Sequence, residues 1–146
     1  MTAIKRLRRK DLTSCAKLYV RAFNGKPWND KWTIATALQR LNDIQDTPGF
    51  YGLKLLQGDR IIAAMHGNVE SWYHRFHFNL KEMYVDPKHQ RSGIGTLLLT
   101  RMRNDLKERG VIGVYLFTSS KKGISTFYQK NGYKILKDMI MMSSRI

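Results

Sequence analysis

The spacing of apolar and polar residues divides the chain into segments of different expected structure. After Asp11, apolar residues recur at intervals of three and four, which predicts an amphipathic helix capped by Asp11. A second helix of the same kind is expected after a cap at Asn29 or Asp30, ending before the turn-like residues 46–49. The residues carrying the two patterns are Leu12, Cys15, Leu18, Tyr19 and Ala22, then Trp32, Ala35, Leu38 and Leu41.

Extended segments precede and follow these helices. Residues 3–8 are expected to form a short first strand, and three further strands are predicted over 50–56, 60–69 and 76–85. Because only short, turn-forming segments separate the three later strands, they are expected to pair as an antiparallel meander.

The last third of the chain returns to alternating helices and strands. A long helix is predicted from Gly93 to Gly110, with Ile94, Leu97, Leu98, Met102 and Leu106 on its buried face. The nearly continuous apolar run 111–118 indicates a strand buried on both faces, with a parallel neighbour. A short helix over 124–130 and a last strand over 133–142 complete the order. The whole predicts one α/β domain over residues 1–146, with a mixed sheet.

Charge is the main anomaly of composition. The 146 residues carry a formal net charge of +15, which raises nucleic acid, a membrane surface and polyanionic ligands as partners. The basic residues are dispersed along the chain, so a solvated surface is the favoured interpretation. No apolar run reaches the length of a membrane span and no signal peptide is evident, so a cytoplasmic protein is expected.

Cysteine and histidine give no reason to expect a metal or a thiol nucleophile. Cys15 has apolar helical neighbours and no activating base nearby in sequence, so we expect a buried thiol. The four histidines, His66, His74, His77 and His89, lack a zinc-binding spacing and a second cysteine. We therefore predict no metal.

The strongest chemical signal is the turn Gln90-Arg91-Ser92-Gly93-Ile94-Gly95 between a strand and an amphipathic helix. Backbone N–H groups at a helix start have no internal acceptor, and glycines let them approach a pyrophosphate. A dinucleotide fingerprint would need a third glycine where Leu98 stands, and a nucleoside-triphosphate loop would need Gly-Lys-Ser/Thr. Both patterns are absent, and a tight turn that binds nothing is the plain alternative.

Together with Met83-Tyr84-Val85-Asp86-Pro87 before it and Thr96-Leu97-Leu98 after it, this turn resembles the donor-binding motif of the GNAT N-acetyltransferase superfamily. Phe127-Tyr128-Gln129-Lys130-Asn131-Gly132-Tyr133 is similar to the family's C-terminal signature. The resemblance implies the GNAT acyl-CoA N-acyltransferase fold and an enzyme that transfers acetyl from acetyl-CoA to a primary amine by direct attack in a ternary complex.

The resemblance also implies roles for residues. Met83, Tyr84 and Val85 would offer backbone groups to the pantetheine arm, one N–H polarising the thioester carbonyl. The pyrophosphate would lie at the turn formed by Gln90, Arg91, Ser92, Gly93, Ile94, Gly95 and Thr96. Glu82 is the candidate base, although pairing with Lys81 or another cation is an equal alternative, and Tyr128 is the candidate acid for the leaving thiolate.

Three further expectations concern a departure from the family pattern and the amine acceptor. Lys121 stands where many relatives carry an asparagine, and it and Lys122 would meet a CoA phosphate or remain solvated. Trp28 and Trp32 are the leading acceptor-side residues, with a core role as the alternative. The basic charge disfavours aminoglycosides unless the cleft is locally acidic, and it fits a neutral or anionic small amine, or a protein terminus, better. The acidic residues that leave aminoglycosides open are Asp30, Asp43, Asp46, Glu70 and Glu82.

A non-catalytic CoA-binding or nucleic-acid-binding module on the same fold is the alternative function. It ranks second because the candidate catalytic residues Glu82 and Tyr128 are both present. Dimers are common in the family, so the resemblance leaves a homodimer open.

Overall fold

The computed structural model describes residues 1–121 and 123–146. These residues divide into two compact units, Met1–Leu116 and Phe117–Ile146. The single domain over 1–146 stays a prediction.

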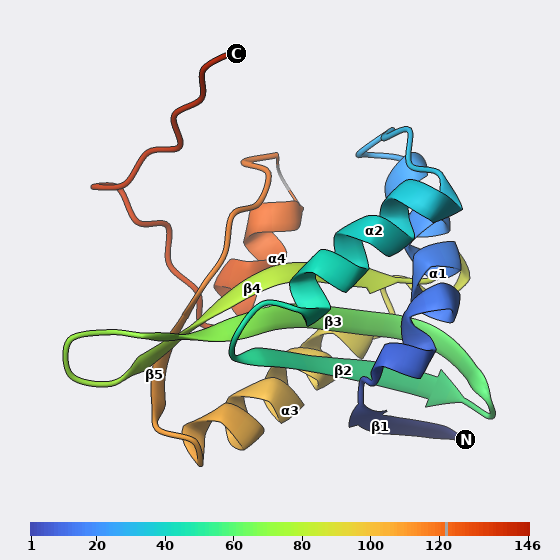
Figure 1. Ribbon diagram of the computed structural model, residues 1–146, viewed down its shortest axis with the longest axis horizontal. Helices are drawn as coiled ribbons and strands as arrows, with labels where there is room; N and C mark the ends of the chain where they lie inside the picture. The colour runs from blue at the N-terminus through green and yellow to red at the C-terminus, as the bar shows by residue number, and fades with distance from the viewer. Residues whose placement is uncertain (122) are drawn as a thin grey trace. The chain divides into compact units, whose positions relative to one another are not determined.

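The first unit is a five-stranded sheet with helices on both faces (Figure 1). The strands lie side by side in chain order, the first four antiparallel and the fifth parallel to the fourth. This confirms the predicted mixed sheet and its antiparallel meander. Its elements are β1 (Thr2–Arg6), the 3-10 turn η1 (Arg9–Asp11), α1 (Leu12–Asn24), α2 (Ile34–Gln45), β2 (Phe50–Gln57), β3 (Arg60–Ser71), β4 (Phe76–Val85), the 3-10 turn η2 (Pro87–His89), α3 (Ile94–Lys107) and β5 (Val111–Tyr115).

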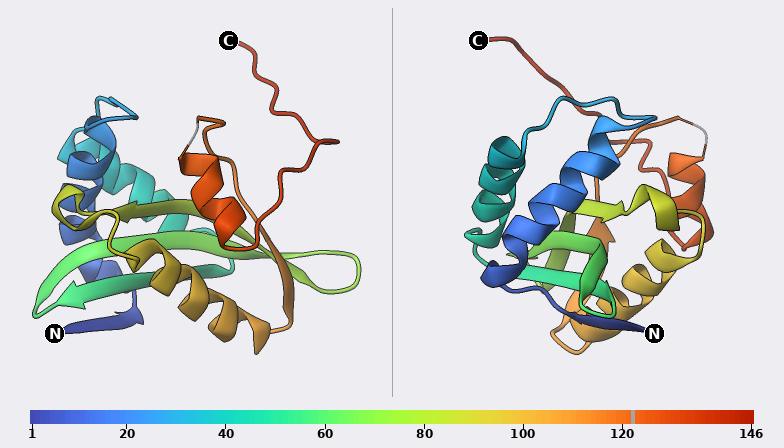
Figure 2. Two further views of the ribbon diagram at one scale, coloured as in Figure 1. Left: turned by 180° about the vertical axis from the view of Figure 1, so that it is seen from behind. Right: turned by 90° about the vertical axis from the view of Figure 1, so that its right-hand side faces the viewer.

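Helices α1 and α2 cover one face of the sheet, and α3 covers the other (Figure 2). Most of the predicted apolar positions account for this arrangement, because Leu12, Cys15 and Leu18 of α1 and Leu98 and Met102 of α3 are all fully or almost fully buried. Leu97 of α3 and Ala35 of α2 are corrections, since both are exposed. The expectation of a buried Cys15 is confirmed. Within the described residues, none of the helices is long and apolar enough to cross a membrane.

The two predicted helix caps need correction. Asp11 precedes α1 as expected, but its carboxylate makes no cap; it accepts from the Arg8 N–H at 2.8 Å and from Lys54 Nζ at 2.7 Å. Thr33 caps α2, in place of Asn29 or Asp30, because its hydroxyl accepts from the Thr36 N–H and the Thr36 hydroxyl accepts in return from the Thr33 N–H.

Strand β5 is shorter and more exposed than predicted. It ends at Tyr115, and the side chain of Ile112 is 47% exposed, so burial on both faces is wrong while the parallel neighbour is confirmed. The apolar run reflects a strand at the edge of the sheet, which exposes one flank to solvent.

Among its described residues, 117–121 and 123–146, the second unit holds one regular element, α4 (Ile124–Lys130), where the sequence predicts it. The predicted strand over 133–142 is absent. The polar pair Lys137-Asp138 forms a turn, with the Met139 N–H donating to the Leu136 carbonyl at 3.4 Å, and this interrupts the extended run. The apolar residues on either side of the turn, such as Ile135 and Met142, are exposed.

Candidate functional site

Strand β4 has an open edge along its second half. Strand β5 pairs with β4 only over residues 76–79, and the register between β3 and β4 shifts so that Lys81 has no partner on β3. A bulge of this kind bends the strand. Among the strands that the structure describes, residues 82–85 of β4 therefore have β3 as their one neighbour, and their other edge is unpaired.

The alternation of an antiparallel ladder identifies the backbone groups at that edge. The Asp86 N–H donates to the Ile62 carbonyl at 2.8 Å, so these two residues form a hydrogen-bonded pair of the ladder. Hydrogen-bonded pairs recur every second residue, and the next one is Tyr84 with Ala64. Met83 and Val85, between these pairs, must direct their N–H and C=O groups away from β3. In agreement, the Val85 carbonyl accepts from Gln90 Nε2 at 3.2 Å. Backbone contacts to a ligand are thus favoured at Met83 and Val85 over Tyr84.

The chain then turns into α3 with its first backbone donors uncapped by any side chain. Gly93 precedes the helix at φ 82°, Arg91 also has a positive φ of 62°, and an added Cβ on Gly93 would meet no atom within 4 Å. The N–H groups that open α3 include those of Ile94, Gly95 and Thr96, which lie before the first intrahelical bond at Leu97. The arrangement suits an anion because free donors and the helix dipole act together.

Asp86 fixes the start of this turn. Its buried carboxylate accepts from the Lys88 N–H at 3.0 Å, and both Arg21 and Arg60 bind it, at 3.3 and 3.1 Å. Burial alone would raise the pKa of Asp86, but the Lys88 hydrogen bond and the two arginines outweigh it and hold that pKa below its usual value. The carboxylate thus stays charged and ties the turn to α1 and β3.

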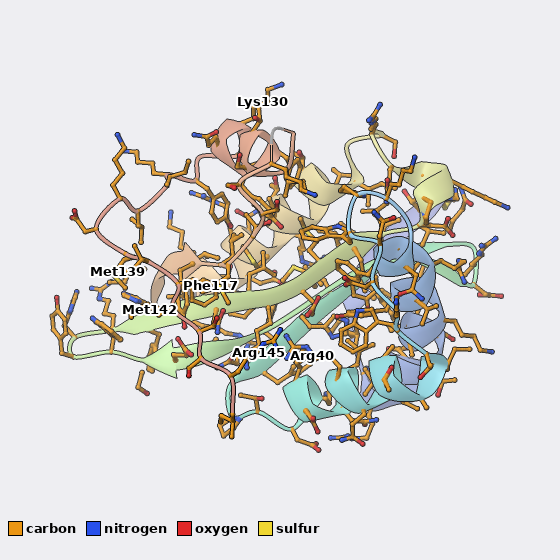
Figure 3. The ribbon with its side chains drawn as sticks, turned by 90° about the horizontal axis from the view of Figure 1, so that it is seen from above. Arg40, Phe117, Lys130, Met139, Met142 and Arg145 are labelled. Carbon is orange, nitrogen blue, oxygen red and sulfur yellow. The ribbon has the colours of Figure 1, made fainter. Side chains whose placement is uncertain are left out.

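Glu82 follows the bulge and faces α2. Arg40 points from α2 toward the sheet (Figure 3) and donates through Nε and Nη2 to Glu82 Oε1, at 3.2 and 3.0 Å. The Tyr19 hydroxyl is a further hydrogen-bond partner of Glu82. Burial raises the pKa of Glu82, and the Arg40 and Tyr19 hydrogen bonds oppose that rise without cancelling it. Glu82 thus has a cationic partner, which is Arg40 and not Lys81, and its role as a base stays a prediction.

The candidate acceptor-side tryptophans lie in an aromatic cluster beside Glu82. The ring of Trp32 meets that of Tyr19 edge-on, with centroids 5.1 Å apart, and its indole N–H donates to Asp30 at 3.1 Å. Trp28 packs against Phe23 and is 39% exposed. Through Tyr19, Trp32 is one side chain removed from Glu82.

Three buried polar side chains, from β4, β3 and α1, contact one another in series. The Tyr84 hydroxyl is 2.7 Å from His66 Nε2 and also interacts with the Cys15 thiol. Burial lowers the pKa of His66 to about 3 and raises that of Cys15 to about 12, so both are neutral at physiological pH. These two contacts hold the Tyr84 side chain in place and therefore position the strand that carries Met83 and Val85.

In the second unit, Tyr128 lies on α4, with its ring against those of Phe127 and Tyr133 at 5.0 and 5.5 Å. The Lys121 N–H donates to the Ser119 hydroxyl at 3.1 Å. Lys122 lies outside the described residues.

Sequence reasoning missed Arg40 and Tyr19 as neighbours of Glu82. Arg40 occupies a polar position of an amphipathic helix, where an arginine is ordinarily solvated, and Tyr19 belongs to the apolar face of α1. Neither position carries a local signal, because both contacts join residues far apart in the sequence.

Comparison with known proteins places this geometry in a family. A family model described as an acetyltransferase (GNAT) domain matches residues 49–135, more than half of the chain. Similar solved structures include an aminoglycoside acetyltransferase from an uncultured soil metagenomic sample, with TM-score 0.77, 19% identity and coverage of 99% of this chain and 96% of that one. A possible acetyltransferase from Clostridium difficile 630 has TM-score 0.80, 16% identity and coverage of 100% and 99%.

A third solved structure is the aminoglycoside N-acetyltransferase AAC(6')-Iy in complex with CoA, with TM-score 0.77, 14% identity and coverage of 100% and 96%. No curated protein matches the chain. At these identities the solved structures establish the fold, and the family model establishes the relationship. The chain belongs to the GNAT acetyltransferase family.

Proposed function

We propose that the protein transfers an acetyl group from acetyl-CoA to a primary amine of a small molecule, peptide or protein. The observation that carries the proposal is the unpaired edge of β4 at residues 82–85, which leads directly into the uncapped start of α3. An extended pantetheine arm would add to that edge as a short strand does, and the pyrophosphate would meet the N–H groups of the turn. The family membership supports acetyl-CoA as the donor.

The residues then have the following roles in a direct transfer. The N–H groups of Met83 and Val85 face the side where the thioester would lie, and one of them would stabilise the negative charge that develops on its oxygen. The amine nitrogen attacks the carbonyl carbon and loses its proton to Glu82, directly or through water, as the carbon–sulfur bond breaks. The departing thiolate takes its proton from Tyr128.

Gly93→Val tests the donor site. The branched side chain would fill the open space at the turn and cost one or two N–H contacts to phosphate. Each such charged hydrogen bond contributes about 1.5–3 kcal/mol, so in calorimetric titration we expect acetyl-CoA to bind about 10- to 150-fold more weakly for one lost contact, and up to about 10⁴-fold more weakly for two.

Gly58→Val is the matched control for Gly93→Val. Gly58 also has a positive φ, of 60°, and nothing lies within 4 Å of its added Cβ, but it belongs to the turn between β2 and β3. Both variants carry the same backbone strain, and circular dichroism checks that both are folded. Unchanged binding in folded Gly93→Val would contradict the phosphate turn. Failure of the wild type to bind acetyl-CoA would contradict the donor assignment.

Tyr128→Phe tests the proposed acid, whose assignment depends on the resemblance of residues 127–133 to the family signature. A thiolate is a good leaving group, so proton donation contributes less here than in most general acid catalysis, and we expect kcat to fall by about 10- to 100-fold. The dissociation constant for acetyl-CoA should stay within roughly twofold of the wild type, because a thioester sulfur is a poor hydrogen-bond acceptor and the contact strengthens only as the thiolate departs. An unchanged kcat with normal donor binding would remove Tyr128 from the mechanism.

A neutral or anionic amine, or a protein terminus, is the acceptor class that the charge favours. The net charge of +15 repels polycations, and Arg40 already neutralises the buried carboxylate beside the open edge. Two of the three solved structures named above are aminoglycoside acetyltransferases, but their likeness to this chain is one of fold. A panel of neutral, anionic and polycationic amines, assayed by release of the CoA thiol, tests this order. Faster turnover of an aminoglycoside than of every other amine would contradict it.

A further inference from the structure

The hairpin formed by β3 and β4 projects beyond the rest of the sheet (Figure 1). Strand β2 pairs with β3 no farther than Asn68, so the hairpin tip at residues 71–77 has no contact with β2 in the ladder. Within the described strands, the start of β5 pairs with the β4 side of the tip, with Phe76 opposite Val111. We call residues 71–77 the hairpin tip.

Aromatic rings dominate the hairpin tip and are solvent-exposed. Tyr73 is 88% exposed, Trp72 54% and Phe76 42%. Trp72 lies on His77 in a parallel stack, with centroids 5.1 Å apart and planes inclined by 19°, and Tyr73 is 6.1 Å from Trp72. The tip encloses an open hollow of about 430 Å³ with Gly110 at its border. These rings do not serve the core, and they expose aromatic surface on which a further flat ring would pack.

The charge around these rings is suited to an anion. The hairpin tip contains Arg75 and two histidines and no acidic residue. The nearest acidic residue on β3, Glu70, accepts a hydrogen bond from the Tyr115 hydroxyl at 2.6 Å. Arg109, next to Gly110, places its guanidinium over the Tyr51 ring, 5.5 Å from the centroid, so Arg75 is the cation that the tip itself offers to a phosphate. With the chain at +15 overall, an anionic partner is favoured over a second copy of the same basic chain.

We propose that the hairpin tip binds single-stranded nucleic acid, with bases stacking on Trp72 and Tyr73 and a phosphate meeting Arg75. Exposed rings in a basic setting are the combination that holds unpaired bases, since every base has a face to stack and every nucleotide a phosphate to pair. The hairpin tip lies at the start of β4 and the proposed donor site at its end. Because β4 has 10 residues, the two sites are about 30 Å apart along the strand. The inference is therefore independent of the acetyl transfer.

The test is fluorescence anisotropy of a labelled 12-nucleotide oligo(dT), titrated with the full chain in 50 mM and 200 mM salt. We expect binding that weakens with salt, and a dissociation constant raised at least about tenfold by the double change Trp72→Ala with Tyr73→Ala. Arg75→Gln should reduce the slope of log affinity against log salt by about one. The matched controls, Trp28→Ala and Lys10→Gln, remove an exposed tryptophan and a surface cation from other parts of the molecule and should bind as the wild type does.

Four results would overturn the proposal. The first is no binding of the oligonucleotide at 50 mM salt, and the second is equal binding by the folded wild type and the double variant. The third is binding of the matching duplex as tightly as of the single strand. The fourth is a wild-type dimer, seen by light scattering, that the double variant abolishes. The last result would assign the tip to self-association. Because the changed side chains are exposed, the variants are expected to fold, and circular dichroism verifies this.

Discussion

Gly67→Ala is expected to destabilise the protein by at least about 3 kcal/mol, a large part of the 5–15 kcal/mol by which domains are ordinarily stable. An added Cβ at this position would lie 2.2 Å from the Asn79 carbonyl oxygen and 2.5 Å from Phe78 Cζ. The Asn79 oxygen is backbone in the ladder between β3 and β4, and Phe78 is fully buried, so neither neighbour can give way cheaply. Urea unfolding followed by circular dichroism measures the loss.

Gly113→Ala is the matched control, because Gly113 is also a strand glycine and its added Cβ would lie 3.9 Å from His77 Cδ2, an ordinary contact. Its free energy of unfolding should change by less than about 1 kcal/mol. A Gly67→Ala protein as stable as Gly113→Ala would show that β3 and β4 can separate at the bulge. The position of the open edge would then no longer be fixed by this packing.

The elements that the sequence predicts well are those set by local patterns. The ends of α3 and α4 follow from glycines and apolar spacing within a few residues, and the turn into α3 follows from Gly93, which has a positive φ in the structure. The prediction of a strand over 133–142 is wrong because a strand depends on a partner strand, and an alternating pattern of apolar and polar residues does not provide one.

In the candidate site, too, local features can be predicted from the sequence and long-range contacts cannot. Glu82 is recognisable from its place beside the motif, but its partner Arg40 is 42 positions away, and only the packing of α2 on the sheet brings them together. The bulge at Lys81, which turns residues 82–85 toward an open edge, leaves no local mark because it arises from a register shift against β3.

Glu82→Gln is expected to lower kcat/KM by about 10²-fold or more, if Glu82 takes the proton from the amine as proposed. A general base must be ionised before it accepts a proton, so activity falls as pH drops through its pKa. Burial raises the pKa of Glu82, and the Arg40 hydrogen bond is the largest opposing influence. Arg40→Met should therefore raise that pKa further and move the acidic limb of kcat/KM to higher pH, whereas Glu82→Gln should abolish the limb.

The pH profile separates catalysis from structure at this ion pair. Deprotonation of the free amine also produces an acidic limb, but that limb belongs to the acceptor and would not move with Arg40→Met. Arg9→Met is the matched control, since Arg9 forms an exposed ion pair with Asp46 on another surface of the molecule, and its removal should leave the profile unchanged. If Glu82→Gln keeps both the wild-type rate and the wild-type limb, the carboxylate only anchors Arg40, and the proton must leave the amine through water.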